Sequence, residues 1–321
     1  MREITYAEAI NEAHRIAMRE NPEVILFGEN VSSNWRLATR GLKEEFGRER
    51  VRDAPITETA FIGAGVGAAI AGMRPIVELM LVDFGLVAMD QIMNQMAKTT
   101  YMTGGSVCVP MVLRALYGAG GGDSATHSES LYGLYAHIPG LKVVVPATPY
   151  DAKGLLLTAI QDLNPVVFFE HRLLYGAKGH VPEEPYMVPF SIANLLREGG
   201  DVTVVAVGKM VQEAVKVADE LKGKISVEVL DPRTLVPLDE EAILRSVRKT
   251  GRLVVVDEDY ERCGFSAEVA ALVAEKGFHS LKAPVARVAN PNVPIPFSRG
   301  LERHVLPDAE KISRAIRSVV K

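Results

Sequence analysis

The sequence predicts an α/β protein with two domains, each a parallel sheet covered by helices. Short β-branched runs alternate with helix-like segments, which is the pattern that produces parallel sheets with helices on both faces. The chain has 321 residues, about twice the usual domain size. The alternation stops between residues 176 and 200, where Pro182, Pro185 and Pro189 fall close together. We therefore place an extended connection at residues 178–199.

The first predicted domain covers residues 1–177. It opens with a helix in which Thr5 and Glu8 have capping-box spacing. Near its end, Thr148 and Pro149 suit the cap and first turn of a helix that runs through Ile160. Strands are predicted at Val24–Gly28, Pro75–Leu79, Pro110–Ala115, Lys142–Ala147 and Val166–Glu170.

The second predicted domain covers residues 200–321 and is a smaller α/β unit. It ends with a helix from about Pro307. Its strands are predicted at Val202–Gly208, Ser226–Asp231, Arg252–Asp257 and Val285–Val288.

Composition narrows the function classes. The net charge is −4 with both signs interspersed, so no basic stripe favours nucleic-acid binding. The only cysteines, Cys108 and Cys263, indicate a reducing compartment. The amino terminus resembles neither a signal nor a transit peptide, and the most apolar stretch, Val77–Met89, is too short and polar to span a bilayer. We expect a cytoplasmic protein with no membrane role.

Three segments contain candidate catalytic residues, and each has a structural alternative. Glu58 precedes a glycine-rich helix, where a carboxylate also interacts favourably with the helix dipole. Phe84 follows a strand, at the end where open α/β sheets bind ligands, but it equally suits a core. His127 lies in a glycine-rich loop beside hydroxyl residues, as a proton carrier or as part of a capping loop. No HExxH pattern indicates a zinc site.

Taken together, the segments resemble the β subunits of the decarboxylating component of pyruvate, branched-chain 2-oxo acid and acetoin dehydrogenases. The similarity covers almost the whole chain. The matching blocks, in order, are Gly28-Glu29, Pro55–Glu58, Ala60–Leu79, Asp90-Gln91, Lys98-Thr99, Tyr101–Gly105, His127-Ser128, Asp231–Asp239 and Pro294–Ser298. The resemblance implies a transketolase-like pyrimidine-binding domain followed by a transketolase-like carboxyl-terminal domain.

The resemblance also implies a thiamine-diphosphate enzyme and assigns roles to single residues. Glu58 matches the glutamate that hydrogen-bonds N1′ of the cofactor aminopyrimidine, and Phe84 matches the aromatic residue packed on that ring. His127 matches a histidine on the substrate side that assists acyl transfer to lipoamide. Glu29 resembles a further acid near the cofactor. The resemblance implies a monovalent-cation site, for potassium, at backbone oxygens of Met111, Ala159, Ile160 and Asp162, with Asn164.

A partner is implied as well. Relatives of this class hold the diphosphate through Mg²⁺ on a GDG-plus-Asn motif, whereas this chain has Gly122-Asp123-Ser124 and no GDG. An α subunit in an α₂β₂ heterotetramer is therefore expected to supply the metal, with a dihydrolipoyl acyltransferase core as a second partner. The expected activity is oxidative decarboxylation of pyruvate or a branched-chain 2-oxo acid, and the alternatives are an acetoin dehydrogenase β subunit and a non-catalytic α/β scaffold. The chain departs from many relatives at Asn30 and over residues 32–39.

Overall fold

The computed structural model describes residues 2–33 and 37–321, so part of the divergent 32–39 segment lies outside the described residues. The chain forms two compact units. The amino-terminal unit runs to Tyr117 and resumes at Tyr135–Phe190, and the carboxyl-terminal unit comprises Gly118–Leu134 and Ser191–Lys321. The loop that follows the first unit's fifth strand thus belongs to the second unit. The domain limits predicted from the sequence, residues 1–177 and 200–321, stay a prediction.

The amino-terminal unit is built on a parallel sheet with the strand order β6-β7-β5-β4-β2-β3. Because all these strands run the same way, their carboxyl ends meet at one edge. The strands are β2 (Val24–Gly28), β3 (Val51–Asp53), β4 (Arg74–Leu81), β5 (Val112–Tyr117), β6 (Lys142–Val144) and β7 (Val166–His171). A separate antiparallel pair joins β1 (Arg2–Thr5) to β8 (Lys178–Val181).

Two helices of this unit, α1 and α6, begin at the residues where the sequence predicts a helix start. α1 (Tyr6–Glu20) has a complete capping box between Thr5 and Glu8, and α6 (Pro149–Gln161) begins at Pro149 behind a Thr148 cap. The other helical segments are α2 (Leu42–Phe46), α3 (Glu58–Ile70), α4 (Ala97–Met102), α5 (Tyr132–Ala136), the 3₁₀ segments η1 (Leu37–Thr39), η2 (Val82–Ala88) and η4 (Arg172–Leu174), and the π segment η3 (Gln91–Met96).

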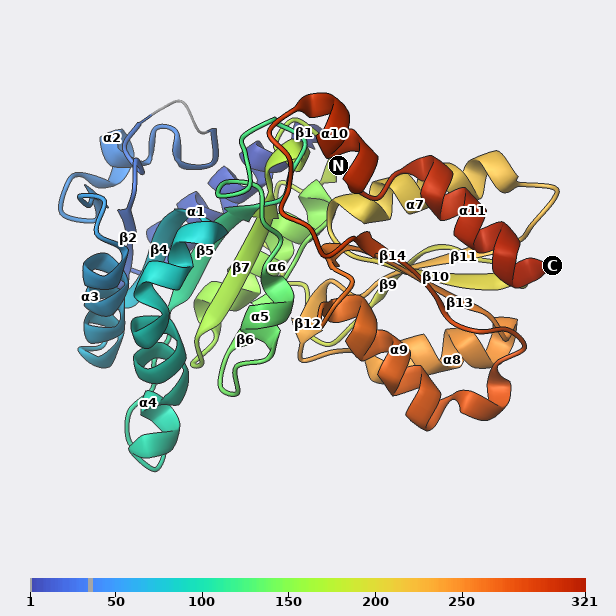
Figure 1. Ribbon diagram of the computed structural model, residues 1–321. Coiled ribbons are helices and arrows are strands. Elements are labelled where there is room, and N and C mark those ends of the chain that lie inside the picture. Colours follow the sequence, from blue (N-terminus) through green and yellow to red (C-terminus); the bar gives the residue numbers. More distant parts are fainter. Residues whose placement is uncertain (1, 34–36) are drawn as a thin grey trace. The chain divides into compact units, whose positions relative to one another are not determined.

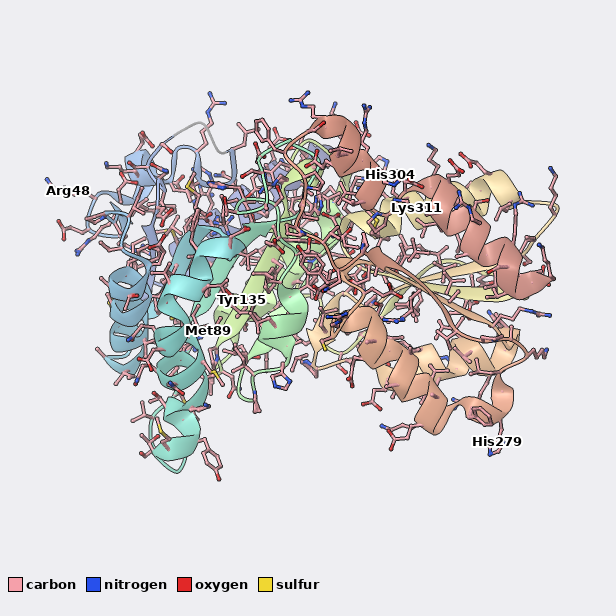
Figure 2. The ribbon with its side chains drawn as sticks, in the orientation of Figure 1. Arg48, Met89, Tyr135, His279, His304 and Lys311 are labelled. Carbon is pink, nitrogen blue, oxygen red and sulfur yellow. The ribbon has the colours of Figure 1, made fainter. Side chains whose placement is uncertain are left out.

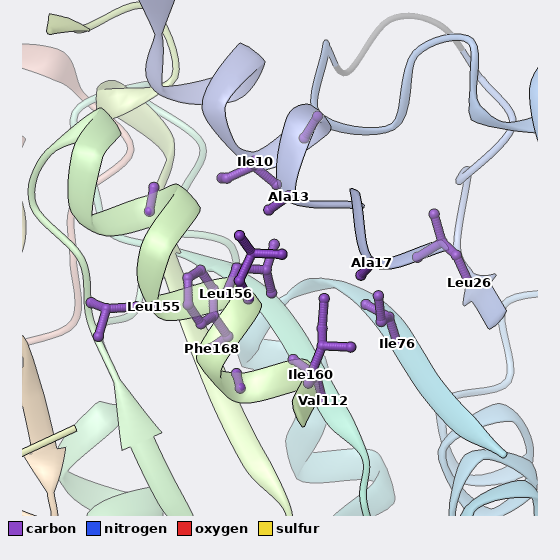
Figure 3. Packing of buried hydrophobic residues seen from close by; sticks show 14 of the residues in the cluster. Ile10, Ala13, Ala17, Leu26, Ile76, Val112, Leu155, Leu156, Ile160 and Phe168 are labelled. Carbon is purple, nitrogen blue, oxygen red and sulfur yellow. The ribbon is translucent and has the colours of Figure 1, made fainter. Parts of the chain in front are cut away.

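The core of this unit lies between the sheet and the pair α1 and α6. Figure 3 shows Ile10 and Ala17 of α1 and Leu156 of α6 directed toward Ile76 and Phe168 on the strands. All five side chains are at most 7% exposed. Burial of this apolar surface stabilises the layer at about 25 cal/mol per Å² removed from water.

The carboxyl-terminal unit is a second α/β layer with the strand order β14-β13-β10-β11-β9. All neighbours are parallel except β9, which is antiparallel to β11. Figure 1 shows α7 and α11 on one face of this sheet and α8 and α9 on the other. Its elements are β9 (Asn194–Arg197), β10 (Val202–Ala206), α7 (Lys209–Leu221), β11 (Val227–Asp231), β12 (Thr234–Val236), α8 (Glu240–Thr250), β13 (Leu253–Tyr260), α9 (Phe265–Lys276), η5 (Phe278–Ser280), β14 (Ala286–Asn290), α10 (Arg299–Val305) and α11 (Ala309–Val320).

The prediction of a two-domain α/β protein with mainly parallel sheets is confirmed, and the sequence analysis missed five strands, β1, β3, β8, β9 and the three-residue β12. β1, β3, β8 and β9 are short, and several of their side chains are charged and exposed. Such edge strands carry no sustained apolar alternation, so only their pairing partners reveal them. Among the described residues, no helix has the length and apolar character needed to cross a bilayer.

Candidate active site

The carboxyl edge of the first sheet holds Glu29, directly after β2. Its side chain is 4% exposed, and its backbone N–H donates to the Glu78 carbonyl at 3.1 Å. The preceding Gly28 has φ +138°, and a Cβ there would lie 2.2 Å from the Glu78 carbonyl oxygen. Only glycine allows β2 and β4 to approach this closely while the chain turns toward Glu29.

Glu58 is the first residue of α3, which packs tightly against the sheet. A Cβ on Gly65 would come within 2.7 Å of a Val77 methyl group, so the glycine lets α3 lie close to β4. The Thr59 hydroxyl donates to the Val87 carbonyl at 2.9 Å and ties the start of α3 to η2. The segment that carries Glu58 is therefore fixed beside the segment that carries Phe84.

Glu58 is a buried residue whose carboxylate has no partner among the described residues. The residue is 8% exposed, and no group within residues 2–33 and 37–321 forms a hydrogen bond or ion pair with its side chain. The carboxylate oxygens are absent from the fully buried unpaired atoms, so they are accessible to a group that binds from outside the chain.

Phe84 lies in η2, after β4, and is half-buried. The neighbouring segment does not form a uniform core stripe, because Met96 is fully buried while Met93 is 38% exposed. The aromatic ring is thus at the boundary of the core rather than within it.

Three charged side chains on the neighbouring strands β4, β5 and β7 form a buried ion cluster in this sheet. Arg114 on β5 is 1% exposed, and its guanidinium contacts Glu78 at 2.7 Å and Glu170 at 2.6 and 2.8 Å. Burial alone would lower the pKa of Arg114, but the carboxylates of Glu170 and Glu78 raise it above its ordinary value. The sequence analysis missed this cluster, although single charges inside apolar strands were the available signal.

His127 belongs to the carboxyl-terminal unit, in the loop between β5 and α5. The residue is half-buried, and its Nδ1 lies 2.9 Å from the Thr126 hydroxyl. Its backbone N–H donates to the Ser124 carbonyl at 3.2 Å. This contact makes a tight turn whose first residue, Ser124, has φ +74°. The Thr126 hydroxyl orients the imidazole through Nδ1.

The five residues of the implied cation site converge at the end of α6. Arg74 donates to the carbonyls of Ile160 and Asp162 at 2.8 and 3.2 Å, and Val166 N–H donates to the Met111 carbonyl at 2.9 Å. The oxygen-rich set is of the kind that hard cations prefer, and the Arg74 guanidinium already lies at two of these oxygens. Asn164 donates to the Asp162 side chain at 3.0 Å, which fixes its amide nearby. Among the described residues, no three His, Cys, Asp or Glu side chains form a metal-binding group.

A pocket of about 490 Å³ lies between α3 and the strands β2 and β3. Its lining includes Phe27, Pro55, Ala60 and Ala64 but neither Glu58, Glu29 nor Phe84. Thr57, which precedes Glu58, also lines this pocket.

Comparisons with known proteins agree with this architecture. Residues 2–178 match the transketolase pyrimidine binding domain, and residues 192–312 match the transketolase C-terminal domain. A solved structure described as a split gene transketolase, inactive beta4 tetramer, has a TM-score of 0.81 at 24% identity and covers 99% of this chain and 98% of that one. The fold and the two domain matches thus define a transketolase-like protein.

Curated relatives narrow the class further. The acetoin:2,6-dichlorophenolindophenol oxidoreductase subunit beta of Bacillus subtilis (strain 168) is 49% identical, covering 97% of this chain and 95% of the relative. The 2-oxoisovalerate dehydrogenase subunit beta of the same organism is 41% identical over 99% of both chains. The pyruvate dehydrogenase E1 component subunit beta of Rhizobium meliloti (strain 1021) is 43% identical, covering 99% of this chain and 70% of the relative. The chain belongs to this family of E1 β subunits of 2-oxo acid and acetoin dehydrogenase complexes.

Proposed function

We propose that the chain is the β subunit of a thiamine-diphosphate-dependent E1 enzyme and contributes half of the active site. The proposal rests on Glu58, the buried first residue of α3, because its carboxylate lacks a partner among the described residues. Thiamine diphosphate, when bound, supplies a nucleophilic thiazolium carbon for attack on a carbonyl. Glu58 would hold a proton at N1′ of the aminopyrimidine, and Phe84 would pack against that ring.

His127 takes the second chemical role in this proposal. Its half-buried imidazole, oriented by Thr126, would donate or accept a proton as the acyl group passes to lipoamide on an acyltransferase core. Glu29 is proposed as a further acid near the cofactor, because it is buried at the same sheet edge as Glu58.

An α subunit completes the proposed site and provides Mg²⁺ and the diphosphate contacts, since this sequence contains no GDG motif. The proposed assembly is an α₂β₂ heterotetramer. Its interface is supported by large apolar side chains that are exposed on the segments around α3 and α4. These are Ile56 (76% exposed), Ile70 (47%), Leu86 (53%), Val87 (64%), Met93 (38%), Tyr101 (89%) and Met102 (64%).

A bound potassium ion at the end of α6 is also proposed. The carbonyls of Met111, Ala159, Ile160 and Asp162 and the Asn164 side chain would hold it, next to the two contacts from Arg74. Such an ion would fix the turn between α6 and β7 and take no part in the reaction.

Acetoin is a second candidate substrate, and a specific observation favours it. Two acetoin:2,6-dichlorophenolindophenol oxidoreductase β subunits are 49% and 46% identical to this chain, against 41–45% for the pyruvate and 2-oxoisovalerate dehydrogenase subunits compared. Cleavage beside the carbonyl would release acetaldehyde from acetoin and carbon dioxide from a 2-oxo acid.

The test is reconstitution with an α subunit of the same enzyme family. The pair is assayed with thiamine diphosphate and Mg²⁺ on pyruvate, 2-oxoisovalerate and acetoin, with 2,6-dichlorophenolindophenol as the electron acceptor. We expect turnover of one substrate class by the pair and none by either chain alone. Absence of turnover on every substrate by a pair that binds thiamine diphosphate would favour the scaffold alternative.

A further inference from the structure

We propose that Glu302 is a positioning residue for His127, because its buried carboxylate holds the backbone of the histidine loop. The inference rests on the proposed function, which takes His127 to act in acyl transfer. It adds a residue from the last part of the chain, far in sequence from every candidate discussed so far.

Two backbone amides of the loop converge on a single oxygen of Glu302. The side chain is on α10, and the residue is 1% exposed. Its Oε1 accepts hydrogen bonds from the N–H groups of Gly120 at 2.8 Å and Gly122 at 3.2 Å. Both glycines have positive φ, +106° and +71°. Alternating backbone handedness turns successive amides toward one side and makes a concavity that binds an anion, and here the anion is the Glu302 carboxylate.

His127 follows directly from this concavity. Two residues after Gly122, Ser124 also has positive φ, and its carbonyl accepts the His127 N–H at 3.2 Å. A shift of Gly122 therefore passes through one turn to the imidazole. A Cβ on Gly122 would lie 3.1 Å from Arg299 Cγ and 3.4 Å from the Phe297 carbonyl oxygen, so the loop also lies against the start of α10.

The other anchors of the loop hold its ends. Ala119 N–H donates to Glu258 Oε1 at 2.8 Å, and Gly133 N–H donates to Asp259 Oδ2 at 3.0 Å. The Tyr132 hydroxyl bonds Asp257, and Gly118 N–H donates to the Glu129 carbonyl at 3.0 Å. Glu302 is the acceptor for the amides of Gly120 and Gly122 between these anchors.

The helix that carries Glu302 is itself held in place. Lys311 on α11 donates from Nζ to the carbonyls of His304 and Leu306 at the end of α10, and Figure 2 shows Lys311 and His304 on these neighbouring helices. A cation at a helix carboxyl terminus satisfies carbonyls that have no partner within the helix. Glu302 thus offers the loop a rigid acceptor. Its charge is compensated by the two amides, which makes both bonds stronger than neutral ones.

The first test measures amide hydrogen exchange on the full chain and needs no activity. Glu302→Ala removes the acceptor, whereas Glu302→Gln keeps a neutral oxygen in its place. Glu310→Ala, at a side chain that is 83% exposed, is the matched control. In Glu302→Ala we expect peptides covering residues 119–127 to exchange about tenfold faster or more, with the rest of the carboxyl-terminal unit unchanged. Glu302→Gln should fall between Glu302→Ala and the wild type, and Glu310→Ala should match the wild type.

The second test uses the reconstituted α/β pair. We expect Glu302→Ala to leave hydrogen–deuterium exchange at cofactor C2 unchanged and to lower the rate of acyl transfer to lipoamide roughly 10- to 100-fold, with partial recovery in Glu302→Gln. The KM for the 2-oxo acid or acetoin should change little, since only the later step depends on His127.

Each experimental outcome either supports or overturns the positioning role of Glu302. Wild-type amide exchange in Glu302→Ala, or faster exchange with acyl transfer intact, overturns the proposal. If Glu302→Ala does not fold, Glu302→Gln is decisive, and wild-type behaviour of that variant in both assays overturns it. If the wild-type pair shows no turnover at all, the proposed function fails, while amide exchange still establishes whether Glu302 holds the loop.

Discussion

Replacing Glu58 by glutamine separates the catalytic interpretation of this residue from the structural one. Gln keeps the size of the side chain and a hydrogen-bonding amide, but it cannot share a proton with N1′ of the aminopyrimidine. The residue is 8% exposed and has no partner among the described residues, so the substitution breaks no hydrogen bond or ion pair within them. The folded chain should therefore tolerate it.

The two interpretations predict different magnitudes. If Glu58 only interacts with the α3 dipole, its loss costs about 0.3–1 kcal/mol of unfolding free energy, and cofactor chemistry is unaffected. If it holds the proton at N1′, the chain keeps its stability, because the substitution removes no contact among the described residues. The rate of C2 proton loss then falls about 10²- to 10⁴-fold.

The assay is hydrogen–deuterium exchange at C2 of thiamine diphosphate bound to the reconstituted pair, followed by quenching and NMR. Cofactor affinity should fall far less than the rate, since the diphosphate contacts lie on the α subunit in the proposed assembly. His127→Ala is the control variant and should exchange at the wild-type rate while acyl transfer is impaired. Wild-type C2 exchange in Glu58→Gln would refute the assignment of this glutamate.

Three further predictions concern stability. Arg114→Met leaves two buried carboxylates without their cation and should lower the unfolding free energy by about 3–5 kcal/mol in urea titrations. The control Arg248→Met, at an exposed ion pair with Glu241, should lower it by at most about 1 kcal/mol. Equal effects of the two substitutions would contradict the buried cluster. Burial and the neighbouring Asp257 carboxylate raise the pKa of Asp259 to about 8, above the ordinary value near 3.9. The folded state therefore binds more protons than the unfolded state between these two pKa values, so stability falls as pH rises from about 4 to about 8. Asp259→Asn should reduce the slope of melting temperature against pH. An unchanged slope would exclude Asp259 as the source of this pH dependence. Potassium, but not choline, should raise the melting temperature, by an amount equivalent to about 2.7 kcal/mol at 100 times Kd, and Asn164→Ala should weaken the response; identical melting in both salts would argue against the cation site.

Much of this protein is determined by local sequence. The capping box at Thr5 and Glu8 and the Thr148-Pro149 start of α6 each depend on residues within one helical turn, so they are legible in the chain itself. The period of the apolar residues likewise predicts the strands β2, β4 and β7. The resemblance blocks that contain Glu58 and His127 identified the family without any structure, because each block is a contiguous segment whose residue types are tied to one chemistry.

Other features were decided only by the tertiary structure. Gly28 is required by a backbone carbonyl on another strand, Arg114 by carboxylates on two neighbouring strands, and the loop before α5 by Glu302, which is 180 and 182 residues from the amides that it holds. No local propensity encodes such partners. They are selected when folding removes water from polar groups, since each buried donor or acceptor then requires a partner wherever in the chain the fold provides one.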